Sequence, residues 1–223
     1  YPDDASELTA SLQGFGIPPE NIMYAGGWKT WDSSTNATST TAPSGSNTKP
    51  VYIASGSANL STTGLSFPSI EVASGTTLTI DAGKDVTLSS SANTSSYQSG
   101  NFINDGGTVT MSSDATNFSS LIIEGTATGN ITYNRWVNSV SNSSPSDANP
   151  GWDLVGSPVL NGTLDPTTLA TSGSNYGILP FDNSSSSNGS WTNTTSNATF
   201  TTSTGLGYAM AKTTAGTVAF TGV

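Results

Sequence analysis

Apolar and polar residues alternate in short runs through the middle of the chain, between Val51 and Tyr133. Within 69–90, pairs of apolar residues each enclose one polar residue, which is the period of half-buried β-strands. The pairs are Ile70/Val72, Leu78/Ile80 and Val86/Leu88. The segments between them, 73–75 and 81–85, contain glycine, which adopts positive φ at little cost and allows a sharp turn. Strands this short need neighbours to bury their inner face, so the pattern predicts a stacked β scaffold.

The expected strands of this region centre on apolar residues that recur at short intervals. These residues are Ile53, Ile70, Leu78, Val86, Phe102, Val109, Ile122 and Ile131. If Ile53, Leu78, Phe102 and Ile123 are equivalent positions, the repeat is roughly 21 to 25 residues long, which suits a coil of three short strands and three turns. We therefore expect a parallel β-helix, or solenoid, over residues 49–140.

The flanking segments have different patterns. Residues 1–48 form an irregular N-terminal segment in which Ala5–Leu12 could be a short helix, and 33–46 is expected to be a loop. The Ser, Asn and Pro content of 141–150 indicates a linker. In 151–223, short strands separated by long polar loops favour a β-sandwich-like module. The predicted fold class is all-β, a parallel β-helix followed by a small β-sandwich-like module.

Composition narrows the possible partners. The formal net charge of −10 repels phosphate backbones, so no nucleic acid is an expected partner. No stretch approaches the ~18 consecutive apolar residues of a membrane span. The chain has no cysteine, which excludes disulfides and the usual zinc sites. Charged residues make up only 9%, and the abundance of Ser, Thr and Asn that replaces them favours an extracellular location.

Several longer segments of the sequence resemble those of a known protein family. The first is NFINDGGTVTMSSDATNFSSLIIEGTATGNIT at 101–132, followed by YNRWV at 133–137. Further along are WDLVGSPV, YGILPFDN and GLGYAMAKTTAGTVAFTG. Together they resemble the fibre repeats, and the module that follows them, in large surface proteins that flavobacteria and related Bacteroidota export by type IX secretion. The resemblance covers about 70–223 and implies export to the bacterial cell surface and a β-helix followed by a β-sandwich-like module.

The resemblance also bears on the ends of the chain. Members of that family usually end in a separate sorting domain, whereas this sequence stops at Val223, just after an expected strand. The start at Tyr1 has neither the basic residues nor the apolar stretch of a signal peptide. We therefore expect a processed chain or a fragment of a longer one. The family supplies no catalytic residues to carry over.

Candidate catalytic groups are few. A polysaccharide lyase needs a basic residue, and Arg135 could bind an acidic sugar, although beside Tyr133 and Trp136 it is better explained as a surface residue packed along aromatic side chains. A glycosidase needs two carboxylates about 5 to 10 Å apart. Asp81 and Asp85 are close in sequence, and Glu71 and Glu124 lie in strand patterns and face away from the apolar positions. No catalytic residue is assigned, and a lyase or glycosidase is the alternative to a non-enzymatic protein.

Asp81 and Asp85 are the candidate metal ligands. Aspartate favours turns through hydrogen bonds from its side chain to the backbone, and these two residues bracket a predicted turn. They could also contribute to a Ca²⁺ site, because calcium takes carboxylate and carbonyl oxygens from loops. The D-x-D-x-D-G pattern of a dedicated calcium loop is absent. No other cofactor is expected.

Tyr24, Trp28 and Trp31 are the candidate ligand-binding residues. Their rings could form a platform that stacks on a sugar. The alternative is that the cluster caps the open end of the solenoid. Trp152 and Trp191 are expected to be core residues of the second module.

These patterns together predict a secreted or cell-surface structural and adhesive protein. A solenoid has open ends and edge strands on which copies of itself, or other surface proteins, can stack into fibres. The alternative is a carbohydrate-binding or carbohydrate-cleaving β-helix module, with a polysaccharide as its partner.

Overall fold

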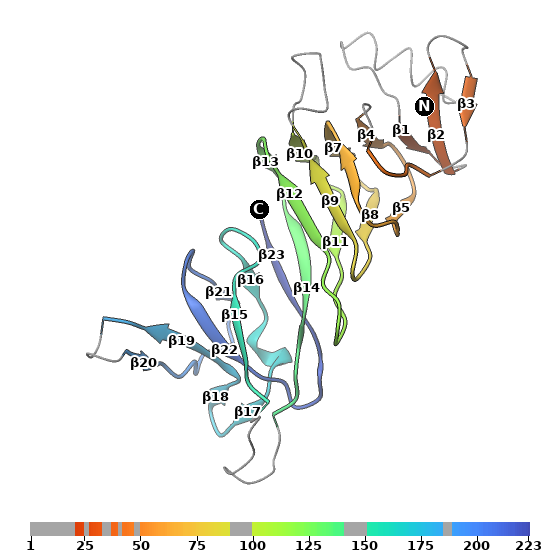
Figure 1. Ribbon diagram of the computed structural model, residues 1–223. Coiled ribbons are helices and arrows are strands. Elements are labelled where there is room, and N and C mark those ends of the chain that lie inside the picture. The colour runs from red at the N-terminus through yellow and green to blue at the C-terminus, as the bar shows by residue number, and fades with distance from the viewer. Residues whose placement is uncertain are drawn as a thin grey trace. The chain divides into compact units, whose positions relative to one another are not determined.

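The structure is a computed structural model that describes residues 42–46, 50–89, 100–140, 151–184 and 189–223, together with the backbone of three strands between residues 21 and 39. The chain is all-β, as predicted, and divides into two compact units (Figure 1). The first unit contains Tyr1–Met111 and Ser119–Asn130, and the second contains Ser112–Phe118 and Ile131–Val223. No helix in these ranges is long and apolar enough to cross a membrane. The helix predicted at Ala5–Leu12 lies outside the described residues.

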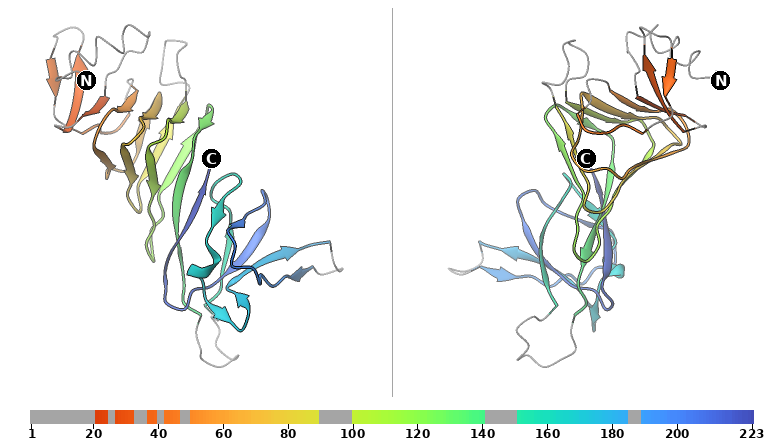
Figure 2. Two further views of the ribbon diagram at one scale, coloured as in Figure 1. Left: turned by 180° about the vertical axis from the view of Figure 1, so that it is seen from behind. Right: turned by 45° about the vertical axis from the view of Figure 1, so that its right-hand side comes forward.

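The first unit is built from short strands that pair in parallel. One sheet contains β4 (Val51–Ile53), β7 (Ser69–Val72), β10 (Asn101–Asn104) and β13 (Ala127–Thr128). A second series contains β5 (Ser57–Leu60), β8 (Thr77–Ile80) and β11 (Thr108–Met111). A third contains β6 (Leu65–Phe67), β9 (Asp85–Leu88) and β12 (Ser120–Ile123). Along the chain, successive strands belong to the first, second and third series in turn. Each group of three strands, such as β7, β8 and β9, therefore lies against the group before it (Figure 2).

The alternation predicted for these strands is confirmed. All six apolar residues of the pairs in 69–90 are fully buried, while the residues between them are partly exposed. Equivalent apolar residues lie in register on neighbouring strands, for example Val51, Ile70 and Phe102. Burial of these rows of side chains holds the strands together, because strands of three or four residues make few backbone hydrogen bonds of their own.

The predicted equivalent positions are wrong, and the predicted spacing of 21 to 25 residues holds for only some pairs, among them Leu65 with Val86 and Phe102 with Ala127. Ile53 and Phe102 do share a sheet, but Leu78 belongs to the second series and Ile123 to the third. Paired residues are 19 to 21 apart between the first two groups and 31 to 35 apart between the next two. The lengths of the connections explain the change: Pro68 alone joins β6 to β7, whereas residues 89–100 join β9 to β10. Strand pairing fixes the register of the strands but leaves the connecting loops free in length.

Strands also occur in the N-terminal segment. β1 (Asn21–Tyr24), β2 (Gly27–Asp32) and β3 (Ala37–Ser39) form an antiparallel meander, and β1 pairs in parallel with β4. This segment is therefore less irregular than predicted, and β3 falls inside the predicted loop 33–46. Because β1 pairs in parallel with β4, the parallel sheet begins before residue 49, where the β-helix was predicted to start.

The second unit consists of antiparallel strands. One sheet contains β14 (Ile131–Val137), β23 (Gly216–Gly222), β16 (Thr163–Leu164) and β21 (Phe200–Thr201). Another contains β15 (Asp153–Gly156), β22 (Gly207–Met210), β19 (Ile178–Asp182) and β20 (Ser190–Trp191). A hairpin, β17 (Thr171–Ser172) and β18 (Asn175–Tyr176), follows a short 3₁₀ turn at Pro166–Thr168. One buried cluster draws side chains from both of these sets of strands, among them Val155, Tyr208 and Phe220.

The boundary between the units falls earlier than the predicted domain boundary at 140. β14 pairs along its whole length with β23, from Ile131 opposite Gly222 to Val137 opposite Gly216. This long antiparallel ladder ties 131–137 to the second unit. The predicted linker, 141–150, lies outside the described residues.

Candidate functional site

Asp81 and Asp85 flank the turn between β8 and β9, as the sequence predicts. Asp81 bonds to strand β5, and Asp85 bonds to the connection between β5 and β6. Asn59 Nδ2 donates to Asp81 Oδ2 at 3.2 Å. Asp85 accepts hydrogen bonds from the Thr63 hydroxyl and from the backbone N–H of Gly64, the latter at 3.0 Å. These carboxylates therefore join the group of strands β7–β9 to the group β4–β6 before it. Within the described residues, no three metal-ligating side chains of the His, Cys, Asp or Glu type come together.

The bonds to Asp85 predict an acid-sensitive contribution to stability. The hydrogen bonds from Thr63 and then from Gly64 lower the pKa of Asp85 below its ordinary value of 3.8. A lowered folded-state pKa means that the ionised group stabilises the fold above the unfolded value, and this contribution is lost as the pH falls through the folded-state pKa. We expect Asp85→Asn to lower the urea midpoint at neutral pH and to converge with the wild type as the pH falls through the lowered folded-state pKa of Asp85.

The matched test is Thr63→Val, which removes the hydrogen bond that contributes most to the lowered pKa of Asp85. It should move the Asp85 carboxyl titration, followed by NMR, back toward the ordinary pKa. An unchanged titration in Thr63→Val would contradict the assignment of the shift to this bond.

Glu71 and Glu124 do not form the carboxylate pair considered from the sequence. Glu124 follows β12, and its Oε2 accepts a hydrogen bond from Ser89 Oγ at 2.9 Å. Glu71 is half-buried in β7, opposite Tyr52 of β4. Burial raises the pKa of Glu71, and the charge of Asp105 raises it further. The electrostatic neighbour of Glu71 is therefore Asp105.

Arg135 packs on an aromatic ring, that of Phe118, which the sequence did not single out. Its guanidinium carbon lies 4.0 Å from the centre of the Phe118 ring, a cation–π contact. The loop that carries Phe118 is held against β14 through Ser113, whose hydroxyl donates to the Asn134 carbonyl at 2.5 Å and accepts from the Trp136 N–H at 2.6 Å. The sequence contains no sign that Phe118 is the partner, because it lies 17 residues before Arg135, in a loop that folds back against β14.

The candidate sugar-binding residues are placed by their backbone alone. Tyr24 ends β1 opposite Gly27, and Trp28 of β2 pairs with Met23. Trp31 pairs with Thr38 of β3. Their side chains lie outside the described part of the chain, so both the platform and the cap remain predictions.

The two tryptophans expected in the core of the second module have other positions. Trp191 lies on β20, an edge strand of two residues, and is 45% exposed, with its ring 4.9 Å from that of Phe181. Trp152 is half-buried and lines a hollow. An edge strand leaves one side of a large ring open, which is why the usual preference of tryptophan for the core does not hold at Trp191.

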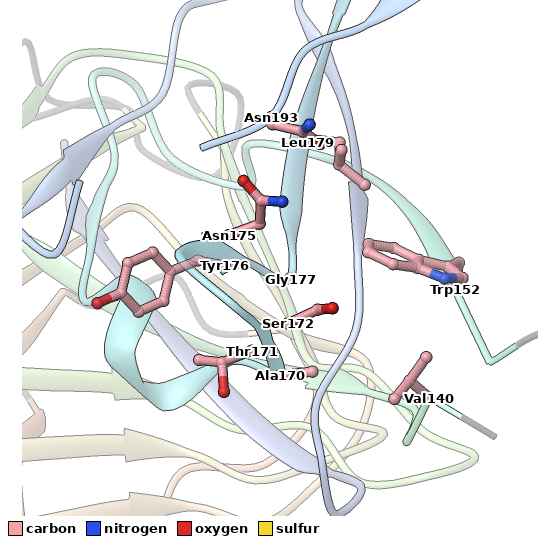
Figure 3. Close-up of a pocket in the computed structure, with 10 residues that line it drawn as sticks. All are labelled: Val140, Trp152, Ala170, Thr171, Ser172, Asn175, Tyr176, Gly177, Leu179 and Asn193. Carbon is pink, nitrogen blue, oxygen red and sulfur yellow. The ribbon is translucent and has the colours of Figure 1, made fainter. Parts of the chain in front are cut away.

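The hollow beside Trp152 was not predicted. Its volume is about 210 Å³, and its walls come from Val140 after β14, Trp152 just before β15, the β17–β18 hairpin, β19 and the loop after β20 (Figure 3). Val140, Trp152 and Leu179 supply apolar surface, and Ser172, Asn175 and Asn193 supply polar groups. Of these six residues the sequence singled out only Trp152. The others come from separate segments of a chain rich in Ser and Asn, in which no single amide stands out.

The comparisons with known proteins identify no relative. No family model matches the chain, and no curated protein or solved structure shows significant similarity to it. The function is therefore argued from the residues and their geometry.

Proposed function

We propose that this chain is a secreted or cell-surface structural and adhesive protein that assembles with copies of itself into fibres. In this proposal the first unit is a parallel β-helix and the second is a β-sandwich-like module. The protein is extracellular, on a bacterial surface, and reaches it by type IX secretion, as the resemblance in 70–223 implies. The low charge and the Ser, Thr and Asn content of the chain agree with that location.

The bonds between successive turns carry the structural part of the proposal. Polar side chains of the first unit, including its acids, form hydrogen bonds between successive groups of strands. The pairs are Asn59–Asp81, Thr63–Asp85, Ser89–Glu124, Asn101–Thr126 and Asn104–Asn130. These hydrogen bonds hold successive groups of strands together, in addition to the burial of their apolar rows. A stacked solenoid of this kind supports an extended, repetitive surface better than a reaction centre.

The edge strand β12 supports assembly. β12 is the last strand of its series and pairs with β9 on one side only. Its Ile122 side chain is 57% exposed. An edge strand with unpaired backbone groups and an exposed apolar residue is a template on which a strand of another copy can add. The proposed contact is therefore edge-to-edge stacking of the first units of two chains.

A charge placed on this edge is expected to suppress assembly. Ile122→Lys should raise the concentration at which the protein forms oligomers or filaments by about tenfold or more, because lysine on an edge strand opposes strand addition. Sedimentation across a concentration series and electron microscopy of the same samples measure this. Leu160→Lys is the matched control, since Leu160 is 52% exposed but lies outside this edge.

Two outcomes would count against the proposal. The first is a wild-type chain that stays monomeric at every concentration, which would remove the fibre role altogether. The second is equal suppression by Ile122→Lys and Leu160→Lys, which would trace the effect to net charge and not to β12.

A further inference from the structure

We propose that the hollow beside Trp152 binds a neutral saccharide. This goes beyond the proposed structural role, since a scaffold needs no ligand, and the two proposals are tested by separate measurements. The site lies wholly within the second unit. It is distinct from Tyr24, Trp28 and Trp31, the sugar platform considered from the sequence.

The shape and size of the hollow suit one small ring. Its volume, about 210 Å³, is below the ~300–1,000 Å³ of pockets that enclose drug-sized ligands. In Figure 3 the Trp152 ring lies across the hollow from Ser172 and Asn175, with Leu179 and Val140 on either side. A ligand held there meets an aromatic surface on one side and polar groups on the other. A sugar ring has this division, with C–H groups on its face and hydroxyls on its rim.

The polar groups of the hollow are available to a ligand. The side-chain amides of Asn175 and Asn193 and the hydroxyl of Ser172 make no hydrogen bond with another residue in the described ranges. An amide both donates and accepts, as does a hydroxyl, so these groups match sugar hydroxyls, which do the same. No lining residue is charged, and this favours a neutral saccharide over a uronic acid or a phosphate.

The wall of the hollow is fixed by backbone hydrogen bonds. The Gly177 N–H donates to the Ala170 carbonyl at 2.6 Å, and the Gly177 carbonyl accepts from the Ala211 N–H at 2.9 Å. The Tyr176 N–H donates to the Thr194 carbonyl at 2.8 Å. A Cβ added at Gly177 would lie 2.5 Å from the Ala211 carbonyl oxygen, so only glycine allows this close approach. The site is therefore preformed, which reduces the ordering that binding would require.

The test titrates the full chain with a panel of neutral mono- and disaccharides, followed by tryptophan fluorescence and by saturation-transfer NMR. We expect saturable binding of at least one neutral hexose or hexosamine derivative. Trp152→Ala and Asn175→Ala should each weaken it about tenfold or more, the scale of one lost stacking or hydrogen-bonding partner. Trp191→Ala is the matched control, because Trp191 lies outside the hollow, and it should leave the affinity unchanged.

Uronic acids and nucleosides are added as comparison ligands. The proposal is overturned if no neutral saccharide binds saturably, if only a nucleoside or a uronic acid binds, or if binding survives both Trp152→Ala and Asn175→Ala. Asn175→Ala keeps the test decisive should Trp152→Ala fail to fold. Sedimentation of the same samples reports assembly, so a chain that forms fibres without binding sugar overturns this inference and leaves the structural role intact.

Discussion

Gly129→Ala is expected to lower the free energy of unfolding of the first unit by about 3 kcal/mol or more, from backbone strain and a steric clash together. Gly129 has φ +78°, a conformation that costs an L-residue about 1–2 kcal/mol. A Cβ there would lie 2.1 Å from the Asn104 carbonyl oxygen and 2.9 Å from the Asn104 carbonyl carbon. The backbone would have to move, and with it the bond from Asn104 Nδ2 to the Asn130 carbonyl at 2.7 Å. Urea unfolding followed by circular dichroism measures the change.

Gly75→Ala separates the two causes. Gly75 has φ +75°, almost the same as Gly129, but no atom outside its immediate neighbours lies within 4 Å of an added Cβ. It should therefore show only the conformational cost, about 1–2 kcal/mol. Equal losses in the two variants would mean that the approach of Asn104 to Gly129 contributes nothing, and the prediction would fail.

The strands of the first unit could be predicted because their signal is local. The alternation of apolar and polar residues at Ile70/Val72 and Leu78/Ile80 reflects only the two-residue period of a strand. The apolar residues are buried whichever strands they pair with. The repeat could not be predicted in the same way. Phe102 aligns with Ile70 and Val51, and Leu78 belongs to another series, which depends on which strands pair. The strands pair whether the connection between them is Pro68 alone or the whole of 89–100.

The candidate sites show the same division between local and distant information. Asp81 and Asp85 were correctly placed at a turn, since aspartate acts on the nearby backbone. Their partners, Asn59 and Thr63, lie 22 residues earlier and follow from the stacking register. The hollow beside Trp152 depends on several loops meeting, and Asn and Ser in a chain rich in both give no sign of it.

Phe220→Ala is the second large expected effect, and it tests the core of the second unit. Phe220 is fully buried in the cluster that draws on both sheets, and it lies opposite Tyr133 on the β14–β23 ladder. Removing a buried phenylalanine side chain costs about 3–5 kcal/mol, because the lost burial adds to the cavity left behind. Amide hydrogen exchange in β14 and β23 should then accelerate by on the order of a hundredfold or more where it proceeds through unfolding.

Thr217→Ala is the control on the same strand. Thr217 is exposed, three residues before Phe220 and so on the opposite face of β23, and its replacement should change stability by no more than about 0.5 kcal/mol. If Phe220→Ala were no more harmful than Thr217→Ala, the cluster would not be the core that joins the two sheets. The expected contrast between these two positions of one strand follows from the alternation of its side chains, the same pattern that predicts the strands of the first unit.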